Sequence, residues 1–325
     1  MAECNAIIHI LSKTTRSQKQ CDETVETVLR TLLAKAVGPT TWLSDSVCKI
    51  EANLNTAGRP PALRECHQLR TLSEVHVVEK EHNVEIIIQP LALFRLHQTP
   101  GLAVFDMDST LIQQEVVDEL ARSVGRYEAV AAVTEAAMRG ELDFEASLRA
   151  RVKELNGVST EIWETLKSDV ITFTPGAHAL IKFLKRKGWR TAVLSGGFTP
   201  LAYWVKDQLG LDYAYANHLA VDPVTSTLTG ELEPDAPIVG AELKRELLLK
   251  LAAENGIPVE RTIAVGDGSN DLLMMGAAGL GVAVNAKPKV QEAAPARVNG
   301  RSLLDVAFVL GFGEGEVRDT LNEEP

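Results

Sequence analysis

The sequence predicts an α/β protein in which a doubly wound parallel sheet carries a helical cap insertion and follows a small N-terminal α+β domain. From Gly101 onward, short and almost wholly apolar runs alternate with helical stretches, which is typical of strands buried on both faces. A charged helical stretch interrupts this alternation after its first run, and the preceding part of the chain shows a different order of elements. We therefore divide the chain into residues 1–98 and 99–325, with the cap at about residues 115–175.

Composition sets limits on function. The 325 residues are enough for about two domains, and 45% apolar with 24% charged side chains is a globular balance. A net charge of −11 argues against a nucleic-acid-binding protein. No apolar run reaches the roughly 18 residues of a membrane span, and the N-terminal run is too short for a signal peptide. Because Cys4, Cys21, Cys48 and Cys66 match no metal or redox spacing, we expect thiols in a reducing cytoplasm.

The N-terminal domain contains short apolar runs and two helix-like segments. Apolar runs at residues 6–11, 75–78 and 84–89 indicate extended segments. Apolar residues at helical spacing predict a helix over residues 22–36, and a proline in a first-turn position opens a second predicted helix over residues 61–72. This order favours a split β-α-β unit.

The second domain has the punctuation of a parallel α/β sheet. Four apolar runs predict its strands, at residues 102–105, 191–194, 262–265 and 281–284. Helices are predicted over residues 177–187 and 241–254, and residues 116–172 form a helical insertion directly after the first strand. A threonine- and glycine-rich segment at residues 219–232 predicts an antiparallel hairpin appended to the sheet.

Two carboxylates, Asp106 and Asp108, directly follow the first predicted strand. Alternation along an extended chain places residues two apart on one side, where two carboxylates repel unless a cation lies between them or one keeps its proton. Carboxylate and carbonyl oxygens suit Mg²⁺. The alternatives are a helix cap or a calcium loop, and the calcium loop fits badly because Leu111 and Val117 stand where it needs Gly and Glu.

The second and third of these strands also end in polar groups. Ser195-Gly196-Gly197 forms a strand-to-helix turn of the kind that binds anions through backbone amides, although a plain tight turn is the alternative. Asp267 and Asp271 follow the third strand among glycines. A dinucleotide-binding fingerprint is excluded because Asp271 stands at its sixth position and would repel a pyrophosphate.

Lys244 lies on the helix predicted over residues 241–254, beside an expected buried row of Leu243, Leu247 and Leu251. By itself it reads as a surface lysine, and only its place between the second and third strand ends makes it a candidate. In open parallel sheets, ligands bind beyond the carboxyl ends of the strands, near the switch in strand order. We therefore predict one shared metal and phosphate site at this edge.

These motifs resemble the haloacid dehalogenase (HAD) superfamily of phosphohydrolases, and the longer matches resemble its phosphoserine phosphatase branch. The likeness covers residues 100–300. The catalytic segments that carry it are DMDST from Asp106, LSGG from Leu194, Lys244 and GDGSND from Gly266. In the insertion it is carried by Glu115, by MRGELDF from Met138 and by SLRAR from Ser147. The resemblance implies a HAD-like, Rossmann-type fold with a helical cap over the phosphate site.

The resemblance also implies catalytic roles for the matching carboxylates. Asp106 corresponds to the nucleophile, and Asp108 to the acid that protonates the leaving serine oxygen and later activates water. Mg²⁺ would be held by Asp106, by the backbone carbonyl of Asp108 and by Asp267.

Phosphate-binding groups follow in the same way. The resemblance assigns Ser195, the Gly196 amide and Lys244 to the phosphoryl oxygens, with Asn270 beside the substrate and Asp271 supporting the metal site. Magnesium and several donors together are what the slow uncatalysed hydrolysis of phosphate monoesters requires.

Substrate recognition would come from the cap. The family match implies that Arg151 holds the carboxylate of phosphoserine and that Glu115 neutralises its ammonium group, with Met138 and Phe144 as apolar walls. A solvated helix position is the alternative for each of the four.

The resemblance thus implies Mg²⁺-dependent hydrolysis of O-phospho-L-serine through an aspartyl-phosphate, the last step of serine biosynthesis. One alternative is a phosphotransferase that passes the phosphoryl group to an alcohol such as homoserine. Another is an amino-acid-sensing module whose ACT-like or ferredoxin-like N-terminal domain binds the ligand, which the complete catalytic set argues against. Weak inhibition by serine through residues 1–98 and a homodimer both stay open.

Overall fold

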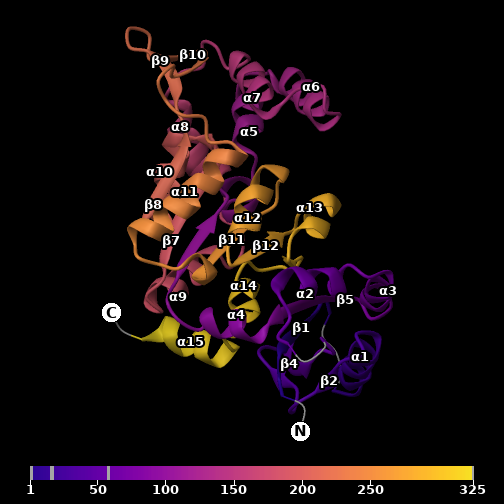
Figure 1. Cartoon of the computed structure of the whole chain (residues 1–325). Coiled ribbons are helices and arrows are strands. Elements are labelled where there is room, and N and C mark those ends of the chain that lie inside the picture. Colours follow the sequence, from indigo (N-terminus) through magenta and orange to yellow (C-terminus); the bar gives the residue numbers. More distant parts are fainter. Residues whose placement is uncertain (1–2, 15–17, 57–58, 324–325) are drawn as a thin grey trace.

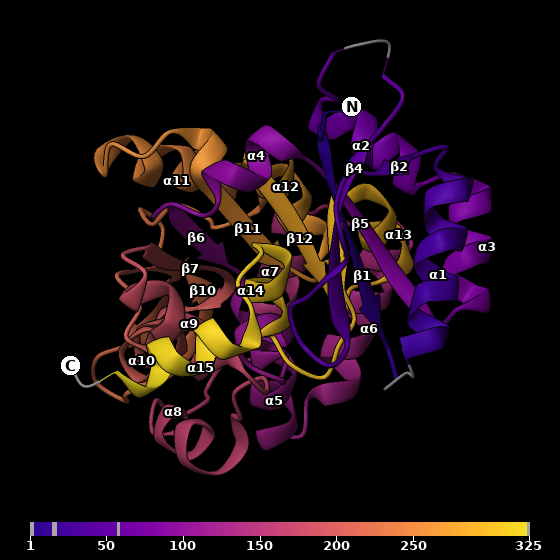
Figure 2. The same cartoon turned by 90° about the horizontal axis from the view of Figure 1, so that it is seen from below.

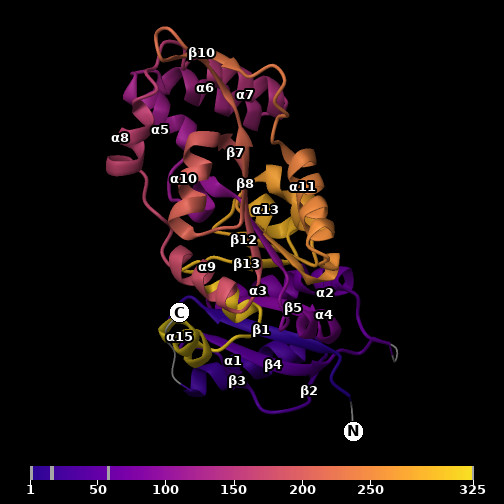
Figure 3. The same cartoon turned by 90° about the vertical axis from the view of Figure 1, so that its left-hand side faces the viewer.

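The computed structural model describes residues 3–14, 18–56 and 59–323, without the side chains of residues 18, 19 and 138. Three parts follow one another along one direction (Figure 1, Figure 3): the N-terminal domain, the parallel sheet with its helices, and the cap at the far end. In the described part of the chain, every helix is too short or too polar to cross a membrane.

The N-terminal domain is built on an antiparallel sheet with the strand order β2-β4-β1-β5, in which β3 also pairs with β4. Its strands are β1 (Ala6–Ser12), β2 (Lys35–Ala36), β3 (Thr41–Trp42), β4 (Val47–Asn53) and β5 (Val84–Pro90). Its helices are α1 (Gln18–Thr31), α2 (Leu63–Arg70) and α3 (Ser73–Glu81). The two long strands that flank β1 run antiparallel to it, which is the pairing of a split β-α-β unit.

Two expectations for this domain are wrong in detail. The apolar run at residues 75–78 lies inside helix α3, where Val75 and Val78 are buried one turn apart. A run of four apolar residues does not distinguish a strand from a buried helix turn. Strand β4 has no predicted counterpart, because Lys49 and Glu51 interrupt its apolar pattern.

The helix ends also differ from the predicted ones. Helix α1 ends at Thr31, and the chain turns through Leu33, which has a positive φ of 51°, before β2 begins. Helix α2 begins after an N-cap at Ala62, so Pro61 precedes the helix and does not lie in its first turn.

The second face of the N-terminal sheet is covered by the rest of the chain (Figure 2). Helices α1 and α3 lie on one face, and α4 (Leu91–Leu96) and α14 (Asp305–Val309) lie on the other. Ile87 is fully buried there, and the Gln89 side-chain amide donates a 3.0 Å hydrogen bond to the carbonyl of Val309. A fragment ending at residue 98 would expose this face, so the domain is best studied within the full chain.

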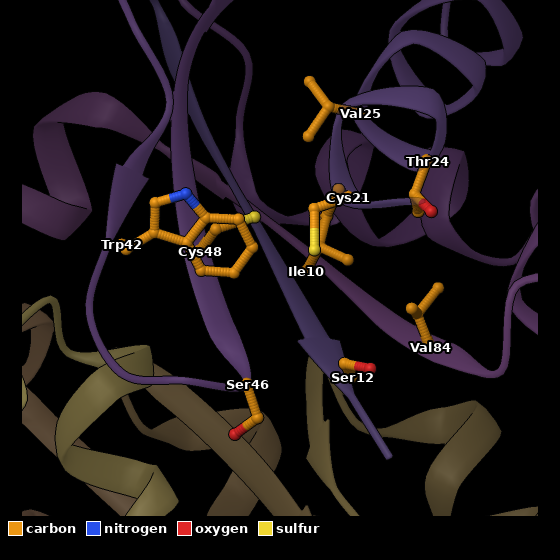
Figure 4. Close-up of a pocket in the computed structure, with 9 residues that line it drawn as sticks. All are labelled: Ile10, Ser12, Cys21, Thr24, Val25, Trp42, Ser46, Cys48 and Val84. Atoms are coloured by element: carbon orange, nitrogen blue, oxygen red, sulfur yellow. The ribbon is translucent and has the colours of Figure 1, made fainter. Parts of the chain in front are cut away.

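A small cavity lies between α1 and the sheet of this domain (Figure 4). Its volume is about 10 Å³, and it is lined by Ile10, Ser12, Cys21, Thr24, Val25, Trp42, Ser46, Cys48 and Val84. Burial raises the pKa of the Cys48 thiol to about 12, which keeps it protonated. A space of this size holds about one water molecule. This cavity is therefore too small for an amino acid such as serine.

The second domain is a six-stranded parallel sheet with the strand order β13-β12-β11-β6-β7-β8. Its strands are β6 (Leu102–Phe105), β7 (Arg190–Phe198), β8 (Tyr213–Asn217), β11 (Thr262–Gly266), β12 (Leu280–Val284) and β13 (Ala296–Val298). The chain runs outward from β6 through β7 and β8, then crosses to β11 on the other side. The switch in strand order therefore lies at β6, as the predicted doubly wound sheet requires.

Helices cover both faces of this sheet. They are α9 (Ala177–Arg186), α10 (Thr199–Leu209), α11 (Ala241–Glu254), α12 (Leu272–Ala277), α13 (Pro288–Ala293) and α15 (Glu314–Asn322), together with α14. Strand β6 shows the alternation: Ala103 and Phe105 pack into the cluster that contains the α9 side chains, whereas Leu102 and Val104 pack with those of α11. Each strand is buried on two sides, which explains its continuous apolar run.

The cap contains α5 (Val116–Ser123), α6 (Tyr127–Met138), α7 (Phe144–Lys153) and α8 (Ile162–Thr165), so its predicted helical character is confirmed. The hairpin β9 (Leu219–Asp222) and β10 (Thr227–Leu232) forms a separate two-stranded sheet. The prediction that this hairpin is appended to the parallel sheet is therefore wrong. Leu228 is buried, and its backbone exchanges hydrogen bonds with Gly157 and Val158 of the cap. The hairpin therefore extends the cap.

Candidate functional site

Three neighbouring strands, β11, β6 and β7, end at one edge of the sheet, and each end supplies polar groups. A hydrogen bond of 2.8 Å from the Asp106 amide to the Val265 carbonyl joins the first two. A cavity of about 690 Å³ opens between this edge and the cap. The predicted residues that line it are Asp106, Asp108, Glu115, Phe144, Arg151, Ser195, Gly196, Asp267 and Asn270.

Lys244 and Asp271 lie buried beneath the cavity floor. The Lys244 ammonium donates 2.7 Å hydrogen bonds to Asp106 Oδ1 and Asp271 Oδ1, and both partners form ion pairs with it. Burial alone would lower the pKa of Lys244, but the two carboxylates outweigh burial and raise it. Lys244 therefore stays charged and holds Asp106 in place.

The burial of Lys244 corrects the sequence analysis. Lys244 itself belongs to the buried row of α11, with Leu247, Leu248 and Leu251, and its exposed fraction is 0%. Leu243, which was expected in that row, is only half-buried. An apolar pattern assigns a charged residue to the solvent, and only the facing carboxylates reverse this assignment.

Three carboxylates form the core of the site. Asp106, Asp267 and Asp271 each place one oxygen within 4.8 Å of the others. Burial and the charge of Asp106 raise the pKa of Asp267 to about 8 and that of Asp271 to about 7. Acids whose charges repel in this way bind a cation well, and an all-oxygen donor set fits Mg²⁺. Asp271, predicted only as support, belongs to this cluster, whereas the Asp108 side chain does not.

The stability gained from Mg²⁺ should increase with pH. The folded-state pKa of about 8 for Asp267 lies above the unfolded value near 3.9, so metal-free protein loses stability as pH rises between these values. Mg²⁺ binds the deprotonated carboxylates and competes with protons for them. We therefore expect saturating Mg²⁺ to raise Tm more at about pH 8.5 than at about pH 6, measured by differential scanning calorimetry.

The control for this experiment is Asp267→Asn, which removes a carboxylate whose pKa is raised to about 8 and should lose most of the Mg²⁺ effect at both pH values. A Tm gain that is equal at both pH values, or larger at the lower one, would contradict a cation site made of these carboxylates.

Asp108 is oriented by the cap. Its Oδ2 accepts a 3.2 Å hydrogen bond from the amide of Val116, the first residue of α5, while its Oδ1 has no partner among the described residues. Burial and the neighbouring charges of Glu115 and Asp106 hold its pKa well above the usual range. Ser109, with a positive φ of 55°, donates a 2.7 Å hydrogen bond to Glu115. The raised pKa favours the protonated form of Asp108, which lines the cavity and is placed to donate a proton.

The end of β7 approaches the cap closely. Ser195, Gly196 and Gly197 were predicted as a strand-to-helix turn, but the strand continues through them to Phe198, with a shift in its pairing to β8. The Ser195 hydroxyl oxygen accepts a 2.8 Å hydrogen bond from the Gly197 amide. A β-carbon at Gly196 would lie 3.4 Å from the Phe144 ring, and one at Gly240 would lie 3.0 Å from it. Glycine at both positions lets the Phe144 ring pack between this strand end and the start of α11.

Asn217, which ends strand β8, was not predicted as a site residue from the sequence. Its side chain is buried, donates a 2.9 Å hydrogen bond to the Gly196 carbonyl and accepts a 2.8 Å hydrogen bond from the Val239 amide. Asn217 therefore connects the end of β7 to the segment that precedes the Lys244 helix. The signal was available, because Asn217 follows the apolar run of a strand that ends at the same sheet edge.

Three further residues were missed. Thr110 is buried and donates a 3.3 Å hydrogen bond to Asp267 Oδ1. Lys287 and Lys289 lie on the cavity rim. No sequence pattern distinguishes these two exposed lysines from others on the surface.

The cap contributes Glu115, Phe144 and Arg151 to the cavity wall. Arg151 is partly buried on α7, and its Nε donates a 3.3 Å hydrogen bond to the Ser147 carbonyl one turn earlier. The positive charge of Arg151 and the negative charge of Glu115 attract each other across the site. Met138, predicted as a second apolar wall, ends α6, and its side chain lies outside the described residues.

The chain is similar in sequence to a known hydrolase family and to characterised enzymes. The family model described as haloacid dehalogenase-like hydrolase matches residues 103–276. The phosphoserine phosphatase of Saccharomyces cerevisiae is 44% identical over 243 residues, which cover 74% of this chain and 77% of the yeast protein. The matched segment of the family model contains the ends of β6, β7 and β11.

Solved structures agree with this match. A probable phosphoserine phosphatase from Vibrio cholerae, in unliganded form, has a TM-score of 0.71 at 29% identity and covers 100% of this chain and 90% of that one. A phosphoserine phosphatase solved as an analogue of its phospho-aspartyl intermediate has a TM-score of 0.60 at 42% identity, over 65% of this chain and 99% of that one.

Proposed function

The chain belongs to the haloacid dehalogenase-like hydrolases, within their phosphoserine phosphatase branch, and on that premise we propose that it hydrolyses O-phospho-L-serine to L-serine and phosphate with Mg²⁺. The supporting observation is that Asp106, Ser195 at the end of β7 and Arg151 of the cap line one cavity. Its volume of about 690 Å³ suits a small molecule. We further propose that this is the last step of serine biosynthesis and takes place in the cytoplasm.

In the first half-reaction, a carboxylate oxygen of Asp106 forms a bond to phosphorus while the ester bond between phosphorus and the serine oxygen breaks. Asp108 gives its proton to that leaving oxygen, so L-serine departs as an alcohol. Lys244 holds Asp106 Oδ1 through a 2.7 Å hydrogen bond, which fixes the nucleophile against the phosphoryl group.

In the second half-reaction, water attacks the phosphorus of the aspartyl-phosphate, and the bond between phosphorus and Asp106 breaks. Asp108, now ionised, takes the proton of that water and returns to its initial state. One residue thus serves first as acid and then as base, which its raised pKa and its free oxygen Oδ1 support.

Charge on the phosphoryl oxygens is met by several groups. Ser195 and the Gly196 amide would donate hydrogen bonds to the phosphoryl oxygens. Asn217 fixes this end of β7 by its hydrogen bond to the Gly196 carbonyl. Asp106, Asp267 and the backbone carbonyl of Asp108 would hold Mg²⁺, which when bound supplies positive charge beside the transferred group. Asp271 forms an ion pair with Lys244 and so balances part of its charge.

The cap selects the amino-acid part of the substrate, and Arg151→Met tests this together with the proposed function. Loss of a charged hydrogen-bond donor to a carboxylate costs about 1.5–3 kcal/mol, so kcat/KM for O-phospho-L-serine should fall about 10-fold to 150-fold. The same variant should change kcat/KM for p-nitrophenyl phosphate, which has no carboxylate, by less than about 3-fold. Both values come from steady-state phosphate release with Mg²⁺.

Arg149→Met is the matched control, because Arg149 lies on the same helix but is exposed and pairs with Glu145. It should leave both activities unchanged. Equal losses on the two substrates in Arg151→Met would refute carboxylate recognition by this residue. A wild-type protein that hydrolyses the aryl phosphate and leaves phosphoserine intact would refute the proposed substrate.

A further inference from the structure

Helix α13 connects the N-terminal domain to the rim of the catalytic cavity (Figure 1). At its beginning, Lys287 and Lys289 line the cavity. At its end, the backbone carbonyls of Gln291 and Glu292 accept hydrogen bonds from helix α2 of the N-terminal domain. A helix of six residues therefore lies between the two parts, with one end in each.

The contact with α2 is made by Arg70, the last residue of that helix. Arg70 is fully buried, and its Nη2 donates hydrogen bonds to the carbonyls of Gln291 (3.1 Å), Glu292 (3.0 Å) and Ala294 (3.0 Å). The His67 Nε2 lies 2.8 Å from the same Glu292 carbonyl. The last carbonyls of a helix have no partner within it, and a cation at that end is favourable. Arg70 thus fixes the end of α13.

Burying the Arg70 guanidinium lowers the stability of the fold, because the charge is desolvated without a paired carboxylate. Among the described residues, its Nε and Nη1 have no hydrogen-bond partner, and no carboxylate lies within ion-pair distance of Arg70. An apolar side chain of similar size would fill the same space without desolvating a charge. From this side, Arg70 makes three hydrogen bonds to the end of α13, and His67 and His76 add one contact each with Glu292. The position of α13 is therefore the feature that this arginine secures.

Lys287 and Lys289 explain why that position matters. The chain carries a net charge of −11, which repels a phosphate dianion, so the attraction must come from local cations. The cationic residues that line the cavity are Arg151, Lys287 and Lys289, and two of these three belong to the start of α13. A shift of the helix would move both lysines away from the entrance.

We propose that Arg70 is a positioning residue for substrate capture: it fixes α13 from the N-terminal domain so that Lys287 and Lys289 stay at the cavity entrance and attract the phosphorylated substrate. This inference rests on the proposed function for the nature of the substrate. It makes the N-terminal domain a part of the capture machinery, at a distance from the reacting atoms.

The mechanical part of the proposal is tested without any substrate. Hydrogen exchange followed by mass spectrometry is compared for the full chain and for Arg70→Met. The amides of residues 290–294 should exchange at least about 10-fold faster in the variant, while peptides from β6 and β11 stay unchanged. Gln89→Leu is the control, since it removes another buried hydrogen bond between the domains, to Val309, without touching α13. Unchanged exchange over residues 290–294 would overturn the proposal.

The capture part is tested by kinetics on O-phospho-L-serine. Lys287→Met/Lys289→Met should raise KM about 3-fold to 10-fold, leave kcat within about 2-fold and weaken the fall of kcat/KM with added salt. Arg70→Met should give the same three changes, and the triple variant should be no worse than either, because all act through one helix. The lysine variant changes only exposed side chains, so this test stands even where Arg70→Met folds poorly.

Two outcomes would overturn the capture role: a loss in kcat with unchanged KM, or additive effects in the triple variant. Should wild-type protein fail to turn over phosphoserine, the proposed function fails, and the affinity for inorganic phosphate measured by calorimetry still decides on Arg70. Weaker phosphate binding in both variants supports the proposal, and unchanged binding in either refutes it.

Discussion

Replacing Asp106 with asparagine is expected to lower kcat for O-phospho-L-serine by at least about 10⁴-fold, the scale on which removal of a covalent nucleophile acts. The amide cannot form the aspartyl-phosphate, and among the described residues no other carboxylate is paired with Lys244 on the cavity side. The fold should be retained, because Asp106→Asn removes one of three clustered carboxylates that repel one another, while Asp271 still pairs with Lys244. Steady-state phosphate release and Tm measure the two effects.

Asp207→Asn is a suitable control for Asp106→Asn, since Asp207 is exposed on α10 and pairs with the adjacent Lys206. It should behave as wild type in both measurements. An Asp106→Asn protein that keeps more than about a tenth of wild-type kcat would show that the nucleophile is another group.

Lys244→Met should both inactivate and destabilise the protein. Breaking a buried ion pair by removing one partner costs about 3–5 kcal/mol, because the remaining charges are left without compensation. Here Asp106 and Asp271 lose their shared cation, and Asp267 stands beside them. We expect the free energy of unfolding, measured with urea, to fall by that amount near neutral pH.

The pH dependence distinguishes this account from simple loss of packing. At about pH 5 the remaining carboxylates take up protons, since the pKa values of Asp267 and Asp271 are about 8 and 7 even with Lys244 present. The deficit of Lys244→Met should therefore shrink on acidification. Lys250→Met, on the exposed side of the same helix, should cost less than about 0.5 kcal/mol. A deficit that is independent of pH would contradict the electrostatic explanation.

The parts of the site that could be predicted from the sequence are those with a short-range pattern. Apolar runs ending in Asp106, Ser195 and Asp267 marked the strands, and helix α11 has its predicted bounds at Ala241 and Glu254. A strand buried on both faces leaves a continuous apolar run, and the rules of parallel sheets then place the ends of neighbouring strands together. This is why the position of the site followed from one sequence.

The parts that could not be predicted depend on partners distant in the chain. Lys244 and Arg70 look like surface residues until the carboxylates of one and the carbonyl acceptors of the other are known. The hairpin at residues 219–232 packs on the cap because Leu228 finds its partners there, which the composition of the hairpin does not encode. Long-range burial of polar groups is the information that local patterns lack.

In the proposed mechanism, the carboxylates at the ends of β6 and β11 form a site in which Asp106 receives a phosphoryl group. Its most direct test is to quench the wild-type protein during turnover of O-phospho-L-serine with Mg²⁺, reduce the acyl phosphate with borohydride and map the product by mass spectrometry. If Asp106 is the nucleophile, we expect conversion of Asp106 to homoserine in wild type and none in Asp106→Asn. Phosphate release at the normal rate with no modified residue, or with the modification at another aspartate, would contradict it.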